Sequence, residues 1–205
     1  MPGSGKRRFW SPAAAAWGGF LIEMLLRIGV GELRAADGDV FEVSNLNRQL
    51  LSVPGLLGRR KAEAAAERAA AVNPDVRFVA IPEFVTKENA AELVQGCDAV
   101  LDALDNIEYR RILAHACAAA EVPMIHGAVS GWTAQAAVMM PNNDLIDRIY
   151  PEGSSLRSKS SLSFTPPFCA AIQTALCVRL VTGRDVESGR LYYADLMDME
   201  IESLS

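Results

Sequence analysis

Helical and strand-like segments alternate regularly along this 205-residue chain. Each strand-like run is short and apolar, and the stretches between the runs are long enough to return the chain across a sheet. This order is typical of parallel sheets that are covered by helices on both faces. The sequence therefore predicts an α/β protein with a doubly wound, mostly parallel sheet.

The alternation can be assigned segment by segment. Predicted helices cover Phe20–Ile28, Arg59–Val72, Lys87–Gln95, Ile107–Ala119 and Pro166–Val181. Predicted strands cover Glu32–Ala36, Val76–Ile81, Ala99–Ala103, Val122–Ile125 and Thr133–Met140, followed by late antiparallel additions at Leu191–Ala194 and Glu200–Leu204. The length favours one Rossmann-like domain over residues 1–205.

One long stretch interrupts the pattern. Residues Asn142–Thr165 have no clear hydrophobic period and contain six serines. Long segments without regular structure in a compact domain are usually functional or disordered. We therefore predict a mobile crossover loop over residues 142–165.

Charge and hydropathy exclude several classes of function. The chain has 20 Lys and Arg against 25 Asp and Glu, a net charge of -5, and its cations are scattered, which argues against nucleic-acid binding. No run reaches the roughly 18 apolar residues of a membrane span, so no membrane association is expected. The basic start at Lys6 is followed by a poor apolar core broken by Pro12, which disfavours a signal peptide. A cytoplasmic protein is expected.

The cysteines do not predict chemistry. They stand at Cys97, Cys117, Cys169 and Cys177. No two have the C-x-x-C spacing of zinc or redox sites, so zinc is not expected and small buried thiols are. Cys169 lies in a predicted helix and is not favoured as a nucleophile.

Acidic residues follow the predicted strands at their carboxyl ends. Asp37 follows one strand, and Asp102 and Asp105 lie at the end of another. Ligands of doubly wound sheets bind beyond these ends, so the three carboxylates are predicted to converge on one crevice. An acid in the position of Asp37 can accept hydrogen bonds from ribose hydroxyls, but nicotinamide enzymes use the same device.

A polar cluster after Asp37 narrows the class of ligand that this site could bind. Asn45, Arg48 and Gln49 follow Asp37 closely, and Lys61 lies one turn into the next predicted helix. Two cations beside a ribose-binding acid suit a nucleoside triphosphate better than a dinucleotide. Either one alone would more often be a solvated surface charge.

These residues form a pattern when read in order. The blocks are D-G-D-x-x-x-x-S-N-L-N-R-Q from Asp37, then Lys61, N-P at Asn73, L-D-A-L-D-N from Leu101 with Arg110, P-x-x-x-G at Pro123, Gln173, and L-V-T-G at Leu180. Together they resemble the ThiF/MoeB/HesA family of ATP-dependent adenylyltransferases. The resemblance runs from about Gly18 to Asp195.

The resemblance implies a function and roles for the residues. Such enzymes adenylylate the C-terminal carboxylate of a small ubiquitin-like sulfur-carrier protein that ends in Gly-Gly. Asp37 would hold the ATP ribose, Asn45 would orient its loop, and Arg48 and Lys61 would grip the phosphates. Arg48 would reach into the partner subunit of a homodimer, and Asp105 would bind Mg²⁺. Attack on an α-phosphate needs alignment and charge neutralisation more than a covalent protein group.

The N-terminus departs from this family. The family opens with a strand and a glycine loop, G-x-G-G-x-G, whose backbone N–H groups cradle phosphates. This chain has F-W-S-P-A-A-A-A-W-G-G from Phe9 to Gly19 instead. Shifting the reading frame by two bases makes each new codon from the last base of one codon and the first two bases of the next. With a suitable choice among synonymous codons, the shifted frame encodes L-V-A-G-C-G-G-L-G. We hypothesise that residues 1–17 are an aberrant, out-of-frame N-terminus, which an unbroken gene with unrelated codons would exclude.

If residues 1–17 are genuine, the first strand and the phosphate loop are lost, and weak ATP binding, poor stability or both are expected. Whatever the origin of residues 1–17, three alternatives stay open for the function. One is a nicotinamide-dependent Rossmann oxidoreductase, and another is a degenerate family member that binds a partner without catalysis. A third, adenylylation of a carboxylate on modified tRNA, is disfavoured by the lack of a basic patch. His126 and His115 are expected to have little chemical role.

Overall fold

A computed structural model of the chain describes residues 7–12, 17–154 and 161–204. The strands are β1 Arg8–Pro12, β2 Glu32–Ala36, β3 Arg77–Ile81, β4 Ala99–Leu101, β5 Met124–Ser130, β6 Thr133–Met139, β7 Leu191–Asp195 and β8 Glu200–Leu204. The helices are α1 Gly18–Ile28, α2 Lys61–Val72, α3 Ala90–Val94, α4 Ile107–Ala119, α5 Leu145–Ile149 and α6 Thr165–Val181, with short 3-10 turns at η1 Val43–Asn45 and η2 Pro54–Leu56.

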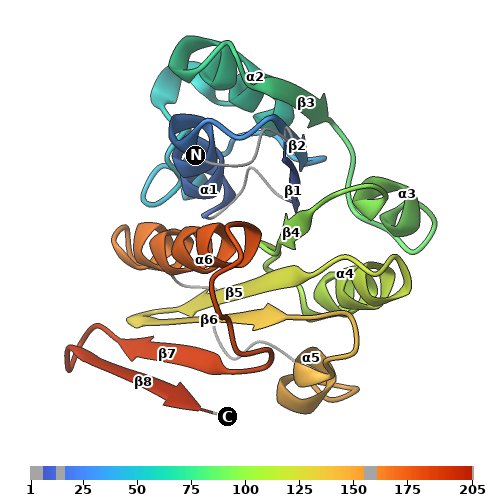
Figure 1. The fold of residues 1–205 in the computed structure, drawn as a ribbon. Helices are drawn as coiled ribbons and strands as arrows, with labels where there is room; N and C mark the ends of the chain where they lie inside the picture. Colours follow the sequence, from blue (N-terminus) through green and yellow to red (C-terminus); the bar gives the residue numbers. More distant parts are fainter. Residues whose placement is uncertain (1–6, 13–16, 155–160, 205) are drawn as a thin grey trace.

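All eight strands form one sheet in the order β3-β2-β1-β4-β5-β6-β7-β8 (Figure 1). The pairs from β3 to β5 are parallel, and those from β5 to β8 are antiparallel. The change of direction occurs at a tight hairpin, where Gly131 adopts a φ of 54° that favours glycine. The predicted doubly wound sheet with late antiparallel strands is confirmed, and the antiparallel part already begins at β6.

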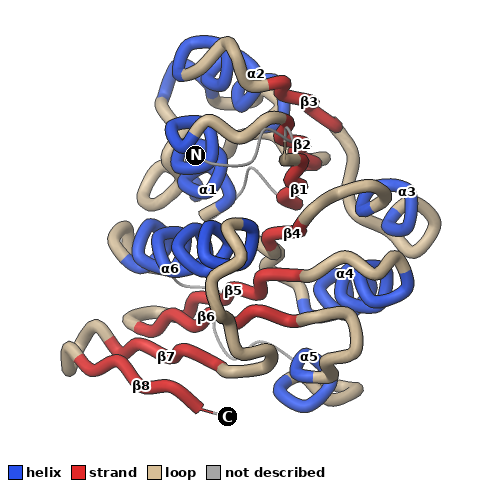
Figure 2. The backbone as a smooth tube through the Cα atoms, in the orientation of Figure 1, coloured by secondary structure: helices blue, strands red, loops and turns tan. Residues whose placement is uncertain are grey.

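Helices cover both faces of the sheet (Figure 2). One apolar cluster joins α1, α2 and α6 to one face, and a second joins α3, α4 and α5 to the other. Leu21, Leu25 and Leu26 of α1 recur at helical spacing and are buried, and Gly29 ends that helix in the left-handed conformation. Burial on both faces explains why the parallel strands read as continuous apolar runs rather than as alternating ones.

The structure corrects the prediction that the first strand is lost. Residues Arg8–Pro12 form β1, which lies in the centre of the sheet between β2 and β4. Phe9 and Trp10 are 2% and 0% exposed and belong to the two different apolar clusters, so each face of the sheet receives one aromatic ring. Residues 13–16, where the glycine loop would stand, and residues 1–6 lie outside the described part, and the out-of-frame origin stays a hypothesis.

The long serine-rich stretch is also partly corrected. Residues Leu145–Ile149 form α5, because Leu145 and Ile146 are buried against the cluster that contains α4. Residues 155–160 of the predicted loop lie outside the described part. None of the helices in the described ranges is long and apolar enough to span a membrane.

Candidate active site

The candidate site lies at the carboxyl ends of β2, β1 and β4. In the sheet, β2 and β3 lie on one side of β1, and β4 and β5 lie on the other, so the strand order reverses at β1. Doubly wound sheets bind ligands at such a switch point. Pro12 pairs with Ala36, and Trp10 pairs with Val100, so the ends of β2 and β4 lie at similar levels. Two strand spacings separate them, roughly 10 Å.

A tight acidic turn follows β2. Asp37 is 5% exposed, and its carboxylate Oδ1 accepts a hydrogen bond from the backbone N–H of Asp39 at 2.8 Å. Between them, a Cβ atom on Gly38 would lie 2.6 Å from the ring of Phe84, so any other residue would require that exposed ring to move. The turn therefore holds the Asp37 carboxylate at the tip of the strand.

Lys61 is brought to the same turn by the start of α2. Its side chain is 4% exposed, and its Nζ lies 3.1 Å from Oδ2 of Asp39. Its backbone N–H donates to the carbonyl of Asp39 at 3.0 Å, so the helix start and the turn are joined twice. Since a buried ammonium needs a paired charge, Asp39 holds this cation at the turn that begins with Asp37. Sequence reasoning grouped Asp37 with Lys61 and assigned Asp39 no role.

Asn45 and Arg48 lie on the next turn. Asn45 is buried, and its Oδ1 accepts from the backbone N–H of Glu42 at 3.0 Å, which fixes η1. Arg48 donates from Nη1 to the carbonyl of Ser44 at 2.8 Å and to Oδ1 of Asn47 at 2.9 Å. Among the described residues, no recorded hydrogen bond or ion pair joins Arg48 to the turn that holds Asp37 and Lys61.

Asp105 and Asp102 follow β4 but face different surroundings. Asp105 is exposed in the turn that leads to α4, where Asn106 caps the helix by accepting from the backbone N–H groups of Glu108 and Tyr109 at 2.8 and 3.2 Å. Asp102 is 0% exposed. The prediction that Asp102 faces the crevice is wrong, because its carboxylate is turned into the core, where it pairs with Arg110.

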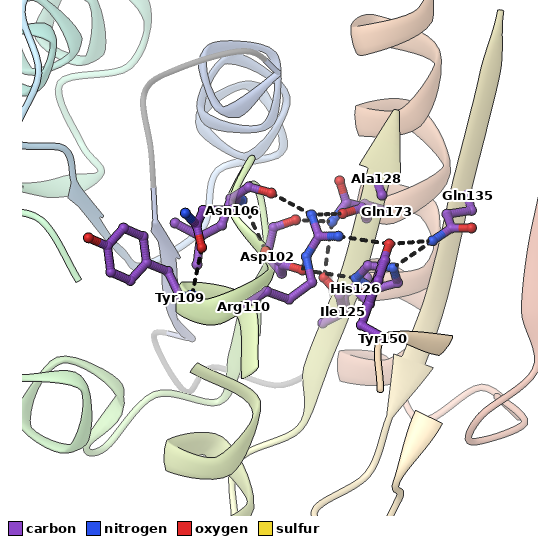
Figure 3. A network of polar contacts seen from close by, with 12 residues as sticks. Asp102, Asn106, Tyr109, Arg110, Ile125, His126, Ala128, Gln135, Tyr150 and Gln173 are labelled. Atoms are coloured by element: carbon purple, nitrogen blue, oxygen red, sulfur yellow. Dashed lines mark hydrogen bonds and ion pairs between the residues drawn. The ribbon is translucent and has the colours of Figure 1, made fainter. Parts of the chain in front are cut away.

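A buried polar network surrounds Asp102 (Figure 3). Oδ2 of Asp102 lies 2.8 Å from Nε of Arg110 and 2.9 Å from Nδ1 of His126. Arg110 is 2% exposed and also donates from Nη2 to the carbonyls of Leu104 and Gly127. Burial alone would raise the pKa of the Asp102 carboxyl, but the Arg110 charge and the His126 bond outweigh it and hold that pKa below its usual value.

Gln173 of α6 ties this network to the start of α1. Its amide N–H groups donate to the carbonyls of Asp102 and Ile125 at 2.8 and 3.0 Å, and its Oε1 accepts from the indole of Trp17 at 2.8 Å. A Cβ on Gly127 would lie 2.3 Å from the Gln173 amide, so this glycine makes room for it. Gln173 thereby joins the end of β4 to the first residues of β5 behind the Asp105 turn.

His126 is neutral in this network. Its Nδ1–H donates to Asp102, and its Nε2 accepts from the amide of Gln135 at 3.2 Å. Burial, helped by the Arg110 charge, lowers the pKa of the imidazole against the opposing effect of Asp102. The unfolded chain binds a proton at His126 near pH 6.5, whereas the folded chain does so only at lower pH.

This shift predicts a loss of stability in mild acid. Because the unfolded state binds more protons below pH 6.5, the free energy of unfolding should fall between pH 6.5 and 5, by up to about 1.4 kcal/mol per pH unit. Urea denaturation at several pH values measures the slope. H126N should flatten the slope that the wild type shows. An unchanged slope in H126N would refute the assignment.

Sequence reasoning expected little chemical role for His126 and did not single out Gln135 or Tyr150, which join it in the network. The hydroxyl of Tyr150 accepts from Arg110 Nη1 and from the Gln135 amide at 2.8 and 2.7 Å. One signal was present, since Gln135 is the one amide in a strand of small and apolar residues. The contact between Gln135 and His126 depends on the register of β6 against β5, which the sequence does not display.

Among the described side chains, the candidate ligand for a metal ion is one exposed carboxylate. No group of three or more His, Cys, Asp or Glu within the described ranges could hold a metal ion. The exposed Asp105 carboxylate fits Mg²⁺, which is often bound through one or two carboxylates together with water and phosphate oxygens. Cys169 is 0% exposed, and burial raises the pKa of its thiol to about 12, which excludes it as a ready nucleophile.

Comparison with known structures agrees with the fold. PaaA superposes with a TM-score of 0.82 at 21% identity, covering 98% of this chain and 73% of PaaA. Escherichia coli MccB crystallised with ATP gives a TM-score of 0.81 at 15% identity, covering 97% of this chain and 63% of MccB. At these identities the likeness concerns the fold alone.

Comparison of sequences is more specific. The SAMP-activating enzyme E1 of Haloferax volcanii is 33% identical over 198 residues, which cover 93% of this chain and 73% of that protein. The sulfur carrier protein ThiS adenylyltransferase of Bacillus subtilis is 32% identical over 181 residues, and the match spans 85% of this chain but only about half, 54%, of that relative. The family model described as ThiF family matches residues 14–205. The chain therefore belongs to the ThiF family of E1-like adenylyltransferases.

Proposed function

We propose that this chain uses ATP to adenylylate the C-terminal carboxylate of a small ubiquitin-like sulfur-carrier protein. Relatives named for this activity support the proposal, among them the Bacillus enzyme and a sulfur carrier protein adenylyltransferase of Thermus thermophilus that is 37% identical over 118 residues. A carrier ending in Gly-Gly, a homodimeric enzyme and action in the cytoplasm belong to the same proposal.

The observation that carries the proposal is the arrangement at one sheet edge. The carboxylate of Asp37 and the buried ammonium of Lys61 share one turn at the end of β2. The exposed carboxylate of Asp105 follows β4, two strands away in the same sheet. An acid for a ribose, a cation for phosphates and a carboxylate for a metal ion are the groups that a bound MgATP requires.

The proposed reaction is a single displacement at phosphorus. A carboxylate oxygen of the carrier attacks the α-phosphorus of ATP, the bond from that phosphorus to the bridging oxygen breaks, and pyrophosphate leaves with the electron pair. Asp37 holds the ribose hydroxyls, and Lys61 neutralises charge on the phosphates. Mg²⁺, when bound at Asp105, supplies further neutralisation of phosphate oxygens. The buried network around Asp102 keeps the Asp105 turn from moving during the displacement.

Arg48 is proposed to act across a dimer. Its guanidinium is folded onto its own turn through Ser44 and Asn47. It is partly exposed, so the side chain has room to leave this turn and reach phosphates in the partner subunit. Asn45 fixes the turn from which Arg48 projects.

Exchange of labelled pyrophosphate into ATP tests the function. The proposal expects exchange that requires both Mg²⁺ and a carrier protein with an intact terminal carboxylate. The carrier with an amidated C-terminus is the matched control and should give none. Binding of a nicotinamide dinucleotide without exchange would support an oxidoreductase instead, and carrier binding without exchange would indicate a degenerate member.

Nucleotide affinity is expected to be weak, because the glycine pattern is missing from the sequence before Gly18. The changes A13G, A15G and A16G would complete G-x-G-G-x-G with Gly18, the first residue of α1, as its last glycine. Since one or two regained hydrogen bonds from backbone N–H groups to phosphate contribute about 1.5–3 kcal/mol each, ATP affinity should rise at least about tenfold. Isothermal titration measures this. Micromolar affinity of the unmodified chain would contradict the expectation.

A further inference from the structure

Tyr150 lies where the segment after α5 meets the sheet, and its hydroxyl accepts hydrogen bonds from two different elements. It accepts from Nη1 of Arg110 at 2.8 Å and from the Gln135 amide at 2.7 Å. The Arg110 guanidinium carbon lies 5.1 Å from the centroid of the Tyr150 ring, and the His126 ring stands edge-on to it at 5.9 Å. Burial raises the pKa of the phenol, which keeps it protonated at neutral pH.

Arg110 carries this contact to the Asp105 turn. Nη1 of Arg110 bonds Tyr150, while Nη2 bonds the carbonyl of Leu104, the residue directly before Asp105. The backbone N–H of the same Leu104 donates to Oδ1 of Asp102 at 3.0 Å. Both polar backbone groups of Leu104 are therefore held by the ion pair that Tyr150 supports, as Figure 3 shows for Tyr150, Arg110 and Asp102.

The Tyr150 hydroxyl completes the hydrogen bonding of the buried Arg110 guanidinium. A hydrophobic side chain could cover Arg110, but a guanidinium N–H without an acceptor would then be buried. The Tyr150 hydroxyl fills that position from a separate element, 40 residues along the chain. The planar guanidinium passes any displacement of its Tyr150 partner to its Leu104 partner, because its donors are fixed relative to one another.

We infer that Tyr150 is a positioning residue, which sets the Asp105 carboxylate through Arg110 and the backbone of Leu104. The inference rests on the proposed function in that it takes Asp105 to bind the magnesium of MgATP. Tyr150 itself is assigned no contact with substrate. The position of the segment after α5 on the sheet would thereby influence the position of Asp105, the proposed magnesium ligand.

The test is Y150F, which removes the hydroxyl and keeps the ring. The matched control is Y193F: Tyr193 on β7 lines the same groove of about 190 Å³ as Tyr150 and Gln135, but its hydroxyl makes no recorded bond to the network within the described residues. Two quantities are measured in each variant. The first is the Mg²⁺ concentration that gives half-maximal ATP–pyrophosphate exchange, which is compared with the KM for the carrier protein. The second is the rate of hydrogen exchange at the backbone amide of Leu104.

In Y150F, the half-maximal Mg²⁺ concentration should rise about fivefold to tenfold, the equivalent of one net hydrogen bond, with the carrier KM within about twofold of wild type. Exchange of the Leu104 amide should accelerate by a similar factor, and Y193F should change neither. A Y150F variant that matches Y193F in both quantities overturns the inference, as does one that raises only the carrier KM. If wild type shows no pyrophosphate exchange but the Leu104 amide still responds to Y150F, the proposed function fails while the positioning role stands.

Discussion

Replacing Arg110 by methionine is expected to lower the free energy of unfolding by about 3–5 kcal/mol. The change keeps much of the apolar stem but leaves the Asp102 carboxylate buried without its main counter-charge. It also removes the donors to the Leu104 and Gly127 carbonyls and to Tyr150. Such a loss is large against the total stability of a single domain, about 5–15 kcal/mol.

The neighbouring arginine supplies the control. Arg111 stands next to Arg110 on α4 and pairs with Asp147, but both of these side chains are partly exposed. R111M should therefore cost less than about 1 kcal/mol, as exposed ion pairs do. In urea denaturation, D102N added to R110M should recover part of the loss by removing the stranded charge. Equal losses in R110M and R111M would show that the Asp102–Arg110 pair is not the support described here.

The second large effect is expected on activity. D105N should reduce ATP–pyrophosphate exchange by roughly 100- to 1,000-fold, because it removes the carboxylate proposed to hold Mg²⁺ beside the phosphates. Asp105 is exposed, so the free energy of unfolding should change by no more than about 0.5 kcal/mol. The separation of a large kinetic effect from a small stability effect distinguishes a metal ligand from a structural residue.

The control for D105N is D75N. Asp75 is an exposed carboxylate that precedes β3 and lies at the opposite, amino-terminal edge of the parallel strands. D75N should leave exchange within about twofold of wild type, since a lone surface charge at that distance is largely screened. Retention of wild-type exchange in D105N would remove Asp105 from the proposed mechanism.

Much of the fold could be predicted from periodicity alone. The long helix Ile107–Ala119 and the strands Glu32–Ala36 and Glu200–Leu204 begin and end where the pattern predicts. Others differ in length: the strand expected at Val122–Ile125 is Met124–Ser130, because it pairs with β6 as a hairpin along its whole length. Hairpin pairing depends on a distant partner, which a local pattern does not contain.

Two elements escaped sequence reasoning for different physical reasons. β1 is R-F-W-S-P, and a proline with flanking charges argues against a central strand. The structure tolerates Pro12 because it is the last residue of the strand. α5 has only five residues, too few for a hydrophobic period, and exists because Leu145 and Ile146 pack against the core.

The candidate site divides in the same way. Asp37 and Lys61 were grouped from the sequence because both follow one strand within a short stretch, and the structure joins them to the Asp39 turn. Asp102 was placed in the crevice on strand position alone. Its burial depends on His126, 24 residues away, and on the side chain of Arg110, and strand ends do not reveal which way a carboxylate turns.

The proposed function requires Asp37, Lys61 and Asp105 to surround one MgATP. A crystal structure of the chain with saturating Mg²⁺ and a non-hydrolysable ATP analogue would display this arrangement. We expect one nucleotide at the carboxyl ends of β2, β1 and β4, with its ribose hydroxyls on Asp37, its phosphates beside Lys61 and the metal ion at Asp105. A nucleotide bound elsewhere, or one that reaches Asp37 while Asp105 faces away from its phosphates, would refute the proposed site.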